Sequence, residues 1–311
     1  MTSVLPITVT HTLGERISVA ADGTELKAYV NAPDPVAFES RKPYIHPLRT
    51  LQGRVVSGYR PNDHRWHKGL QMTASHLSGQ NFWGGDCYVH GEGYLRRPEL
   101  VGSMRHDGFD ALEVACDRLD FTERLTWIEN GGEAWARERR ELALHSVDAE
   151  TSTYALDWAI HLTNIRGESL HFGSPTTHGR EMAGYTGLQW RGPRDFTGGQ
   201  VLSPAGPSTG EEMMGESASE HPWLGFVGEH DDVDAHSTIA FAHAPQNARS
   251  VHASHWFVRS EPIPTVAFSW SFFEEFTLPP GDSFSYRYRM LIADGAWEAE
   301  KIQKRLSSLA W

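Results

Sequence analysis

Residues 59–70 bring two histidines and a carboxylate close together. Asp63, His64 and His67 follow a Pro-Asn turn. An imidazole can transfer protons near neutral pH or bind a metal, and a neighbouring carboxylate can fix its tautomer. A zinc site needs at least three protein ligands, and the sequence contains neither an HExxH motif nor paired CxxC motifs. We therefore interpret His64 and His67 as candidate acids or bases, and we expect no metal and no other cofactor.

Residues 42–50, with the sequence KPYIHPLRT, contain a third candidate histidine. Two prolines fix the backbone, which is typical of a rigid loop that presents polar side chains. His46 is a further candidate acid or base, and Arg49 is a candidate substrate-binding residue. A plain strand connection with exposed polar side chains is the alternative interpretation. A metal-dependent enzyme also stays open, in which His46 or His178 joins the two histidines above.

Residues 176–194, with the sequence TTHGREMAGYTGLQWRGPR, are rich in glycine, which permits tight turns or a close approach to a ligand. Neither nucleotide-binding glycine motif is present. Glu181 is a candidate base, and the candidate substrate-binding residues are His178, Arg180, Trp190 and Arg191. The arginines would hold hydroxyl, keto or carboxylate groups, and the indole would be a stacking surface. Glycine-rich turns with surface arginines are the alternative.

Residues 254–276 begin with a short strand pattern, SHWFVRSEP. In a strand Trp256 and Val258 share one face, while Phe257 and Arg259 share the other. Trp256 is a candidate stacking surface, Arg259 a candidate substrate-binding residue, and Glu261 a candidate base. A structural ion pair between Arg259 and Glu261 is the alternative.

The elements that position these segments are predicted to be strands. Alternation of apolar and polar residues recurs along the chain, helical periodicity is scarce, and Gly-containing turns separate the runs. An Asp22-Gly23 turn predicts a hairpin. The other predicted strands are residues 111–116, 121–129, 137–145, 154–164, 223–227, 238–242, 266–272 and 283–292. The spacing indicates an all-β fold, a large antiparallel β-sandwich without βαβ units.

Two further segments differ from this pattern. Near residues 296–310, Ile302, Leu306 and Leu309 follow helical spacing, which predicts a short amphipathic C-terminal helix with Asp294 as its N-cap. Residues 203–219 are rich in Gly, Ser, Pro and Glu, which predicts a mobile loop. Because the strand pattern is the same on both sides of this loop, we expect residues 1–311 to form a single domain.

Composition excludes several classes of function. The chain has 311 residues, 28 basic and 40 acidic, with a formal net charge of −12. This balance disfavours binding to nucleic acid or to an anionic membrane surface. No apolar window is long enough to span a bilayer, the N-terminus does not resemble a signal peptide, and two cysteines are too few for a disulfide framework. We expect a cytoplasmic protein whose partner is a small molecule; the oligomeric state does not follow.

The four segments together resemble the PmoA-like family, whose members often carry the label "methane oxygenase PmoA". The matching stretches are KPYIHPL, then DHRWHKGL followed by NFW, then THGREMAGYTGLQWRGP, and finally WFVRSEP with a late PGDS. They span residues 28–295 in order. Trp66 departs from the pattern, since the family favours a second histidine there, and this weakens a multi-histidine metal site.

The resemblance implies a galactose-mutarotase-like β-supersandwich and a role in bacterial sugar catabolism. A membrane oxygenase is not implied, because no spanning segment is present. Enzymes with this fold use a histidine acid and a carboxylate base on a concave sheet face. We therefore expect a carbohydrate-active enzyme, an epimerase, lyase or hydrolase, acting on a sugar, keto-sugar or sugar acid. A non-catalytic sugar-binding module is the alternative.

The four polar segments should meet in space. Four segments framed by Gly or Pro are hard to explain as unrelated surface loops, so we expect His64, His67, Arg180 and Arg259 to face a common cleft. Arginines in this cleft would form a positive patch on an acidic protein and would favour an anionic or strongly polar substrate.

Overall fold

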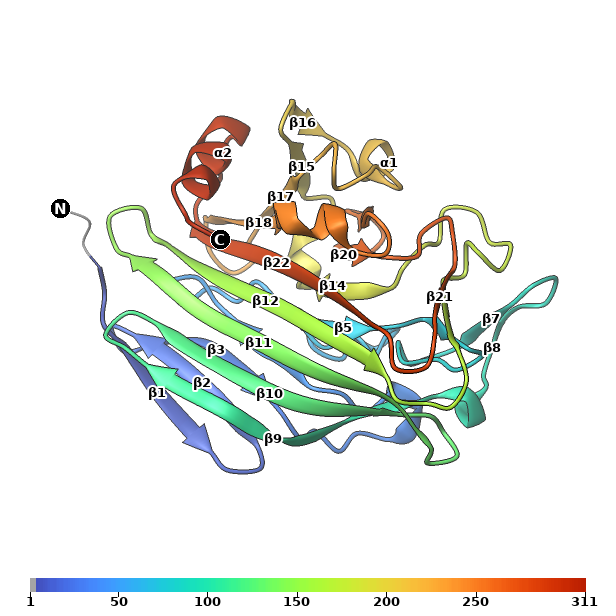
Figure 1. The fold of residues 1–311 in the computed structure, drawn as a ribbon. Coiled ribbons are helices and arrows are strands. Elements are labelled where there is room, and N and C mark those ends of the chain that lie inside the picture. Colours follow the sequence, from blue (N-terminus) through green and yellow to red (C-terminus); the bar gives the residue numbers. More distant parts are fainter. Residues whose placement is uncertain (1–3) are drawn as a thin grey trace.

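Two large antiparallel β-sheets stack face to face in the computed structural model, which describes residues 4–311 (Figure 1). The eight-stranded sheet has the spatial order β1 (Ile7–Thr12), β2 (Arg16–Ala21), β3 (Thr24–Val30), β4 (Tyr44–Leu48), β5 (Leu70–Thr73), β14 (Gly187–Arg191), β20 (Thr265–Ser269) and β19 (His255–Arg259). The nine-stranded sheet has the order β16 (Gly206–Ser208), β15 (Gln200–Ser203), β17 (Trp223–Glu229), β18 (His236–His243), β22 (Ser283–Asp294), β12 (Thr153–Asn164), β11 (Ala134–Asp148), β10 (Leu119–Ile128) and β9 (Ser103–Val114).

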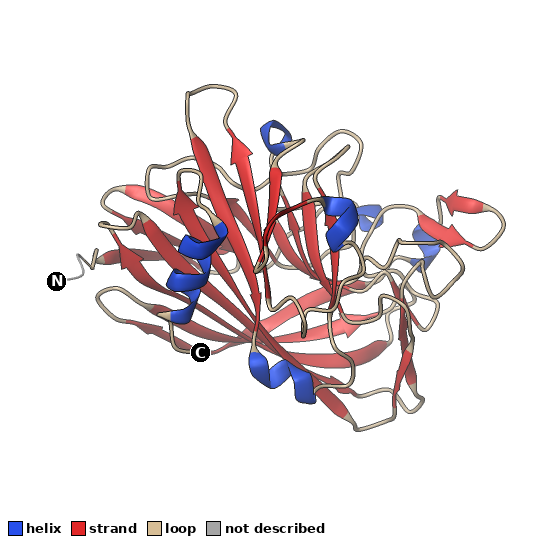
Figure 2. Cartoon of the chain, turned by 90° about the horizontal axis from the view of Figure 1, so that it is seen from above, coloured by secondary structure: helices blue, strands red, loops and turns tan. Residues whose placement is uncertain are grey.

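The remaining elements are short and lie around this sandwich (Figure 2). A three-stranded sheet contains β21 (Phe276–Leu278), β13 (Leu170–Gly173) and β6 (His76–Leu77), and β7 (Cys87–Val89) pairs with β8 (Gly93–Leu95). The α-helices are α1 (Gly210–Met213) and α2 (Ala299–Ser307); the 3-10 turns are η1 (Ala37–Glu39), η2 (Pro98–Leu100), η3 (Arg194–Phe196) and η4 (Pro245–Arg249). The predicted all-β antiparallel sandwich with a short C-terminal helix is confirmed.

The core lies between the two sheets and is unusually aromatic. Strand alternation directs every second side chain inward. Trp127, Trp158, Trp190 and Trp256 are all buried there, and Phe268 lies against Trp256 with ring centroids 4.7 Å apart. Large flat side chains fill the space between the sheets and hold the strands at a fixed distance.

The predicted Asp22-Gly23 hairpin is present between β2 and β3. Asp22 has a φ of 46° and Gly23 a φ of 76°. Positive φ at both central positions is the requirement of a type I′ turn, whose twist matches that of the strands it joins, and Gly adopts this backbone without steric cost.

The C-terminal helix α2 lies on the outer face of the nine-stranded sheet. Its Ile302 is fully buried against the cluster that contains Trp223 and Leu291. The predicted N-cap is wrong, because β22 continues as far as Asp294 and the residue at the N-cap position is Glu298. The Asp294 carboxylate instead accepts a hydrogen bond from Arg54 at 2.9 Å.

Two segments predicted as loops contain regular structure. Residues 42–50 include β4, so the interpretation as a rigid loop is wrong for its central part. Pro47 is tolerated because the register between β3 and β4 shifts at this point. Residues 203–219 contain β16 and α1, and Thr209 and Glu212 form a capping box at the start of α1.

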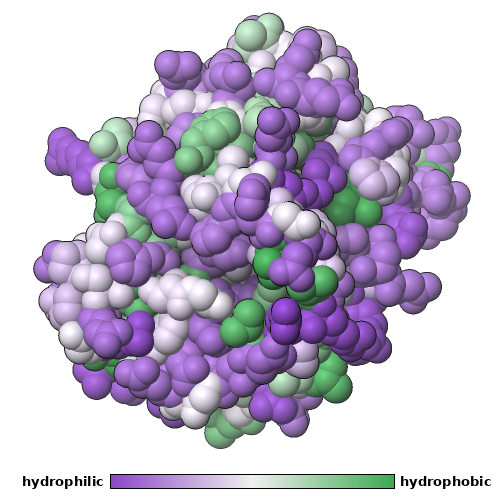
Figure 3. Space-filling model, turned by 90° about the vertical axis from the view of Figure 1, so that its right-hand side faces the viewer, coloured by the Kyte–Doolittle hydropathy of each residue, from purple (hydrophilic) through white to green (hydrophobic). Residues whose placement is uncertain are grey.

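The surface is mainly hydrophilic. Figure 3 shows this for the face at the β7–β8 end, where hydrophobic residues are scattered in small separate spots. Within residues 4–311, no helix is both long enough and apolar enough to cross a membrane.

Candidate functional site

A cavity of about 300 Å³ lies over the outer face of the eight-stranded sheet, above β20 and β19. Phe257 and Arg259 point outward into it, while Trp256 and Val258, on the same strand, point into the core. Its polar lining consists of Asp63, His64, His67, Asp86, Arg180, Arg259 and Thr265. Its aromatic lining consists of Trp66, Trp83, Tyr94, Tyr185 and Phe257. His64, His67, Arg180 and Arg259, up to 195 residues apart, therefore face one cavity.

A buried carboxylate anchors the loop that carries the histidines. Glu39 is fully buried and accepts two hydrogen bonds from Arg60, at 2.7 and 2.9 Å. Its carboxylate also lies 3.3 Å from the ammonium group of Lys68. The backbone N–H of Arg60 donates to the carbonyl of His67 at 2.9 Å. Both ends of the histidine loop are thereby fixed beside the cavity.

His64, Asp63 and His67 form the polar centre of the cavity. His64 Nδ1 lies 3.3 Å from Asp63 Oδ2, and the rings of His64 and His67 have centroids 4.8 Å apart. His67 is only 3% exposed, yet neither ring nitrogen has a hydrogen-bond partner among the described residues. Buried polar groups normally have partners, so an unpaired one in a cavity wall is available to a ligand.

The electrostatics keep both histidines neutral and the carboxylate ionised. Burial lowers the pKa of His64 against the opposing effect of Asp63, and burial together with His64 and Arg191 lowers the pKa of His67 well below its usual value. Burial opposes ionisation of Asp63, but a backbone hydrogen bond, His64 and Arg191 outweigh it and lower its pKa. A neutral imidazole beside a carboxylate can accept a proton.

Arg180 and Arg259 face the cavity without a carboxylate partner among residues 4–311. Arg180 donates a hydrogen bond to the Tyr94 hydroxyl, and its guanidinium lies 4.7 Å from the centre of that ring. Arg259 lies 5.5 Å from the centre of the Phe257 ring. Burial and the neighbouring charge of Arg180 lower the pKa of Arg259. Two free guanidinium groups side by side would be stabilised by an anionic ligand group.

The aromatic walls are packed against one another and are therefore rigid. Trp83 contacts Tyr185 with ring centroids 4.6 Å apart, and Tyr185 contacts Phe257 at 5.6 Å. Trp66 lies against Gly85, where a Cβ atom would come within 2.3 Å of the indole. Only glycine permits this contact, and its φ of 75° also favours glycine.

The structure places several predicted site residues away from the cavity. His46, on β4, stacks on Tyr59 and contacts Ser57. Burial, and to a lesser extent the charge of Arg49, lowers the pKa of His46 to about 4. Arg49 lies 3.7 Å from Glu25. His178 stacks on His76 instead, with ring centroids 4.1 Å apart.

The two tryptophans predicted as stacking surfaces are in the core, so this prediction is wrong. Trp190 is 1% exposed and donates to the carbonyl of Val56, and Trp256 is 0% exposed and donates to the carbonyl of His221. Each belongs to the inward-facing set of its strand, so neither presents a ring face to a ligand.

The predicted carboxylate bases do not line the cavity either. Glu181 and Glu261 are exposed, and Asp63 and Asp86 line the cavity in their place. Arg191 is buried behind the histidines, and its Nε and Nη1 have no partner among the described residues. Burial lowers the pKa of Arg191 to about 10, against the effect of Asp63.

Sequence reasoning missed most of the aromatic lining. Trp66, Trp83, Tyr94, Tyr185 and Phe257 had been assigned no role. Two of them could have been predicted from the sequence, because Trp66 lies between the two histidines and Phe257 shares a strand face with Arg259. Tyr94 carried no such signal, because it reaches the cavity from the β7–β8 hairpin.

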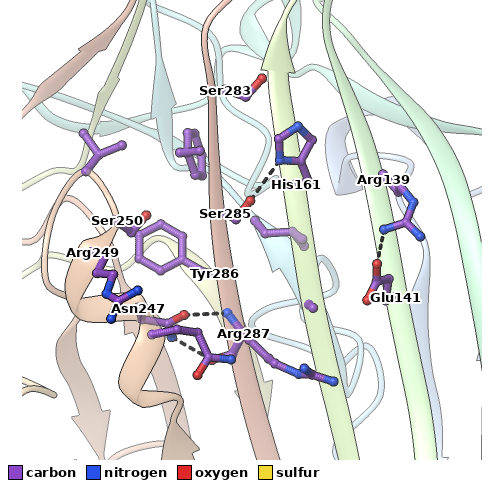
Figure 4. A pocket seen from close by; sticks show the side chains of 15 residues that line it. Arg139, Glu141, His161, Asn247, Arg249, Ser250, Ser283, Ser285, Tyr286 and Arg287 are labelled. Atoms are coloured by element: carbon purple, nitrogen blue, oxygen red, sulfur yellow. Dashed lines mark hydrogen bonds and ion pairs between the residues drawn. The ribbon is translucent and has the colours of Figure 1, made fainter. Parts of the chain in front are cut away.

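A larger hollow, of about 620 Å³, lies on the outer face of the nine-stranded sheet beside η4 (Figure 4). Several of its polar groups have partners: His161 contacts Ser285 at 2.9 Å, Asn247 bonds to both backbone groups of Arg287, and Arg139 pairs with Glu141. Ser250 Oγ and Arg287 Nε have no partner among the described residues. The histidine of this hollow is paired, so the hollow lacks the unpaired imidazole that the cavity presents. Over residues 4–311 no group of three or more His, Cys, Asp or Glu residues is arranged to hold a metal.

The chain matches the model of a family of unknown function (DUF6807) over residues 16–307. This match does not confirm the PmoA-like resemblance. No curated protein matches the chain.

Among solved structures the chain is similar to a GH36 α-galactosidase from Geobacillus stearothermophilus in complex with raffinose, at 12% identity and a TM-score of 0.40, covering 93% of this chain and 41% of that one. An α-galactosidase from Lactobacillus brevis is similar at 9% identity and a TM-score of 0.38, with 93% and 40% covered. A galactose 1-epimerase from Lactobacillus acidophilus NCFM is similar at 8% identity and a TM-score of 0.34, with 94% and 100% covered. The chain spans about two-fifths of the length of the α-galactosidases. At these TM-scores the likenesses say nothing about its reaction.

Proposed function

We propose that this chain, which belongs to a family of unknown function (DUF6807), binds a sugar acid or keto-sugar in the cavity. It then transfers a proton at the carbon next to the carboxylate or keto group of the ligand. His64 is the base, and Asp63 stabilises the imidazolium that forms. Arg180 and Arg259 hold the carboxylate or keto oxygen. An epimerase or a lyase begins with this step.

One observation carries the proposal: unpaired polar groups converge on one aromatic cavity. His67 has two free ring nitrogens, and Arg180 and Arg259 have no carboxylate partner among the described residues. Leaving such groups unpaired costs free energy, and ligand binding recovers that cost. Aromatic walls suit the apolar C–H faces of a sugar ring, and the cavity volume lies at the lower end of the range for small-molecule sites.

The electrostatics suit proton removal from carbon. A hydrogen next to a carboxylate or ketone becomes acidic only when the negative charge that develops on oxygen is stabilised, and two guanidinium groups supply that stabilisation. His64 is neutral at pH 7 and can accept the proton. Proton transfer by a positioned side chain contributes on the order of 10²–10⁴-fold in rate.

Hydrogen–deuterium exchange of the ligand tests the proposal. Hexuronic acids, aldonic acids and keto-hexoses are incubated with the protein in D2O, and loss of the C–H signal is followed by proton NMR. We expect exchange with at least one of these compounds, and we expect His64→Gln to abolish the exchange while retaining binding.

His161→Gln is the matched control, because His161 lies on the outer face of the other sheet. It should exchange at the wild-type rate. Binding without exchange in the wild type would indicate a sugar-binding module. Absence of binding in all these classes would overturn the proposal.

A further inference from the structure

A second hollow, of about 410 Å³, adjoins the cavity, and Arg259 lines both. Met182 lies in the second hollow and Arg180 in the first, only two residues apart in the chain. Met214 of the second hollow packs against the cluster that contains Phe257 and Tyr185 of the first. The two hollows thus share Arg259 as a common lining residue, and side chains of both pack on one small hydrophobic cluster.

The balance of charge differs between the two hollows. The cavity presents two arginines, Arg180 and Arg259, together with two aspartates, whereas the second hollow presents Glu211 and Glu261 beside Arg259 alone. Both glutamates are exposed, and neither forms an ion pair with any part of the chain that the structure describes. Carboxylates accept hydrogen bonds from hydroxyl and ammonium groups and repel a second anionic group.

The second hollow also has an apolar side. Met182 and Met214 line it, and Met182 is 42% exposed. Flexible thioether side chains adapt to apolar surfaces of different shape, so they are suited to the apolar face of a sugar.

We infer that the two hollows are adjacent subsites of one cleft for a two-unit ligand. This inference rests on the proposed function and specifies its substrate class. The acidic sugar occupies the cavity, and a hydroxyl- or amino-bearing sugar linked to it occupies the second hollow. Arg259 lies at the junction, where it contacts both units.

Paired ligands test this arrangement. A hexuronic acid and the disaccharide in which the same acid is linked to a neutral hexose are titrated against the full chain by calorimetry. We expect the disaccharide to bind at least roughly tenfold more tightly, which corresponds to about 1.4 kcal/mol. Met182→Ala and Glu261→Gln should each reduce this advantage and leave the affinity for the monosaccharide unchanged.

Glu220→Gln is the matched control, since Glu220 is exposed and lines neither hollow. It should retain the wild-type ratio of the two affinities. If the monosaccharide binds and the disaccharide binds no more tightly, the two-subsite inference is wrong while the proposed function stands. If neither ligand binds, the two-subsite inference is wrong, and the exchange experiment with aldonic acids and keto-hexoses decides the proposed function.

Discussion

Two polar clusters of this protein differ in whether their groups are paired. Between the sheets, Arg140 donates to Glu138 at 2.7 and 2.9 Å and to the Tyr29 hydroxyl at 3.0 Å. Trp127 donates to Glu138 at 2.8 Å, and Tyr29 donates to the fully buried Glu123. In the cavity, by contrast, neither ring nitrogen of His67 has a partner, and Arg180 and Arg259 have no carboxylate partner in the described chain. The interior network links the two sheets, whereas the cavity leaves its hydrogen-bonding capacity for a ligand.

This contrast separates stability from function. Breaking a buried ion pair destabilises the fold, because the remaining partner is left unpaired in a low-dielectric interior. An unpaired group at a cavity wall already carries that cost, so removing it affects binding more than folding. Four measurements test this distinction.

The largest expected effect is on stability, from Arg140→Met. The variant leaves the Glu138 carboxylate without its bidentate partner, and we expect a loss of about 3–5 kcal/mol in the free energy of unfolding, measured by urea denaturation. Arg180→Met is the matched control in the cavity and should change stability by less than about 0.5 kcal/mol. Similar losses in both variants would show that the contrast between the clusters is not real.

The next effect is on turnover. Asp63→Asn removes the carboxylate that stabilises the imidazolium of His64, and we expect the rate of ligand deuterium exchange to fall on the order of 10²–10⁴-fold. Affinity for the same ligand should change much less, because the lost interaction acts mainly in the transition state. An equal loss of affinity and rate would indicate that Asp63 binds substrate and does not support a base.

The third effect is on ligand affinity. Arg259→Ala removes a charge-assisted hydrogen bond, and we expect sugar-acid binding to weaken by about 1.5–3 kcal/mol in calorimetry, with an unchanged melting temperature without ligand. Arg139→Ala, on the outer face of the nine-stranded sheet, is the matched control. Unaltered affinity in Arg259→Ala would place the anionic group elsewhere.

The fourth effect is a pH dependence of stability. Burial lowers the pKa of His243 to about 4, whereas the unfolded chain titrates near 6.5. The unfolded state then binds more protons between these values, so stability is full above pH 6.5 and falls as the pH drops toward 4, by about 1.4 kcal/mol per pH unit.

Replacement of this buried group should remove its share of the slope. Urea denaturation at pH 7 and pH 5 should show a smaller decrease for His243→Gln than for the wild type. A difference between the two proteins that stays constant over this range would contradict the assignment. His67, whose pKa burial also lowers, should behave in the same way unless a bound ligand pairs its ring.

Adjacent residues in a strand explain the errors in the predicted site. Trp190 and Arg191 are neighbours in β14, so their side chains point to opposite faces and could not both contact one ligand. The same rule had placed Phe257 and Arg259 on one face of β19. Alternation alone does not indicate which face of a strand is buried. The nine-stranded sheet packs against the face that carries Trp256 and Trp190, so that face is the interior.

Part of the interior network could also be predicted from the sequence. Glu123 falls at an inward position between Phe121 and Leu125 in β10, a place where an apolar residue is expected. A charged residue there predicts a buried partner. One partner, His106, lies on the neighbouring strand β9, 2.5 Å from the carboxylate. The other, Tyr29, lies 94 residues away on the opposite sheet, and only the stacking of the sheets brings it to Glu123.

Neighbouring residues and their periodicity were enough to predict the antiparallel strands, the Asp22-Gly23 turn, the amphipathic C-terminal helix and the loop that carries Asp63, His64 and His67. Only the folded chain brings this loop to Arg180, Arg259 and Tyr94. It also places Asp86, and not Glu181 or Glu261, in the cavity lining with Asp63. Contacts of this kind follow from how the sheets pack and where the connecting loops return, and those depend on the whole chain at once.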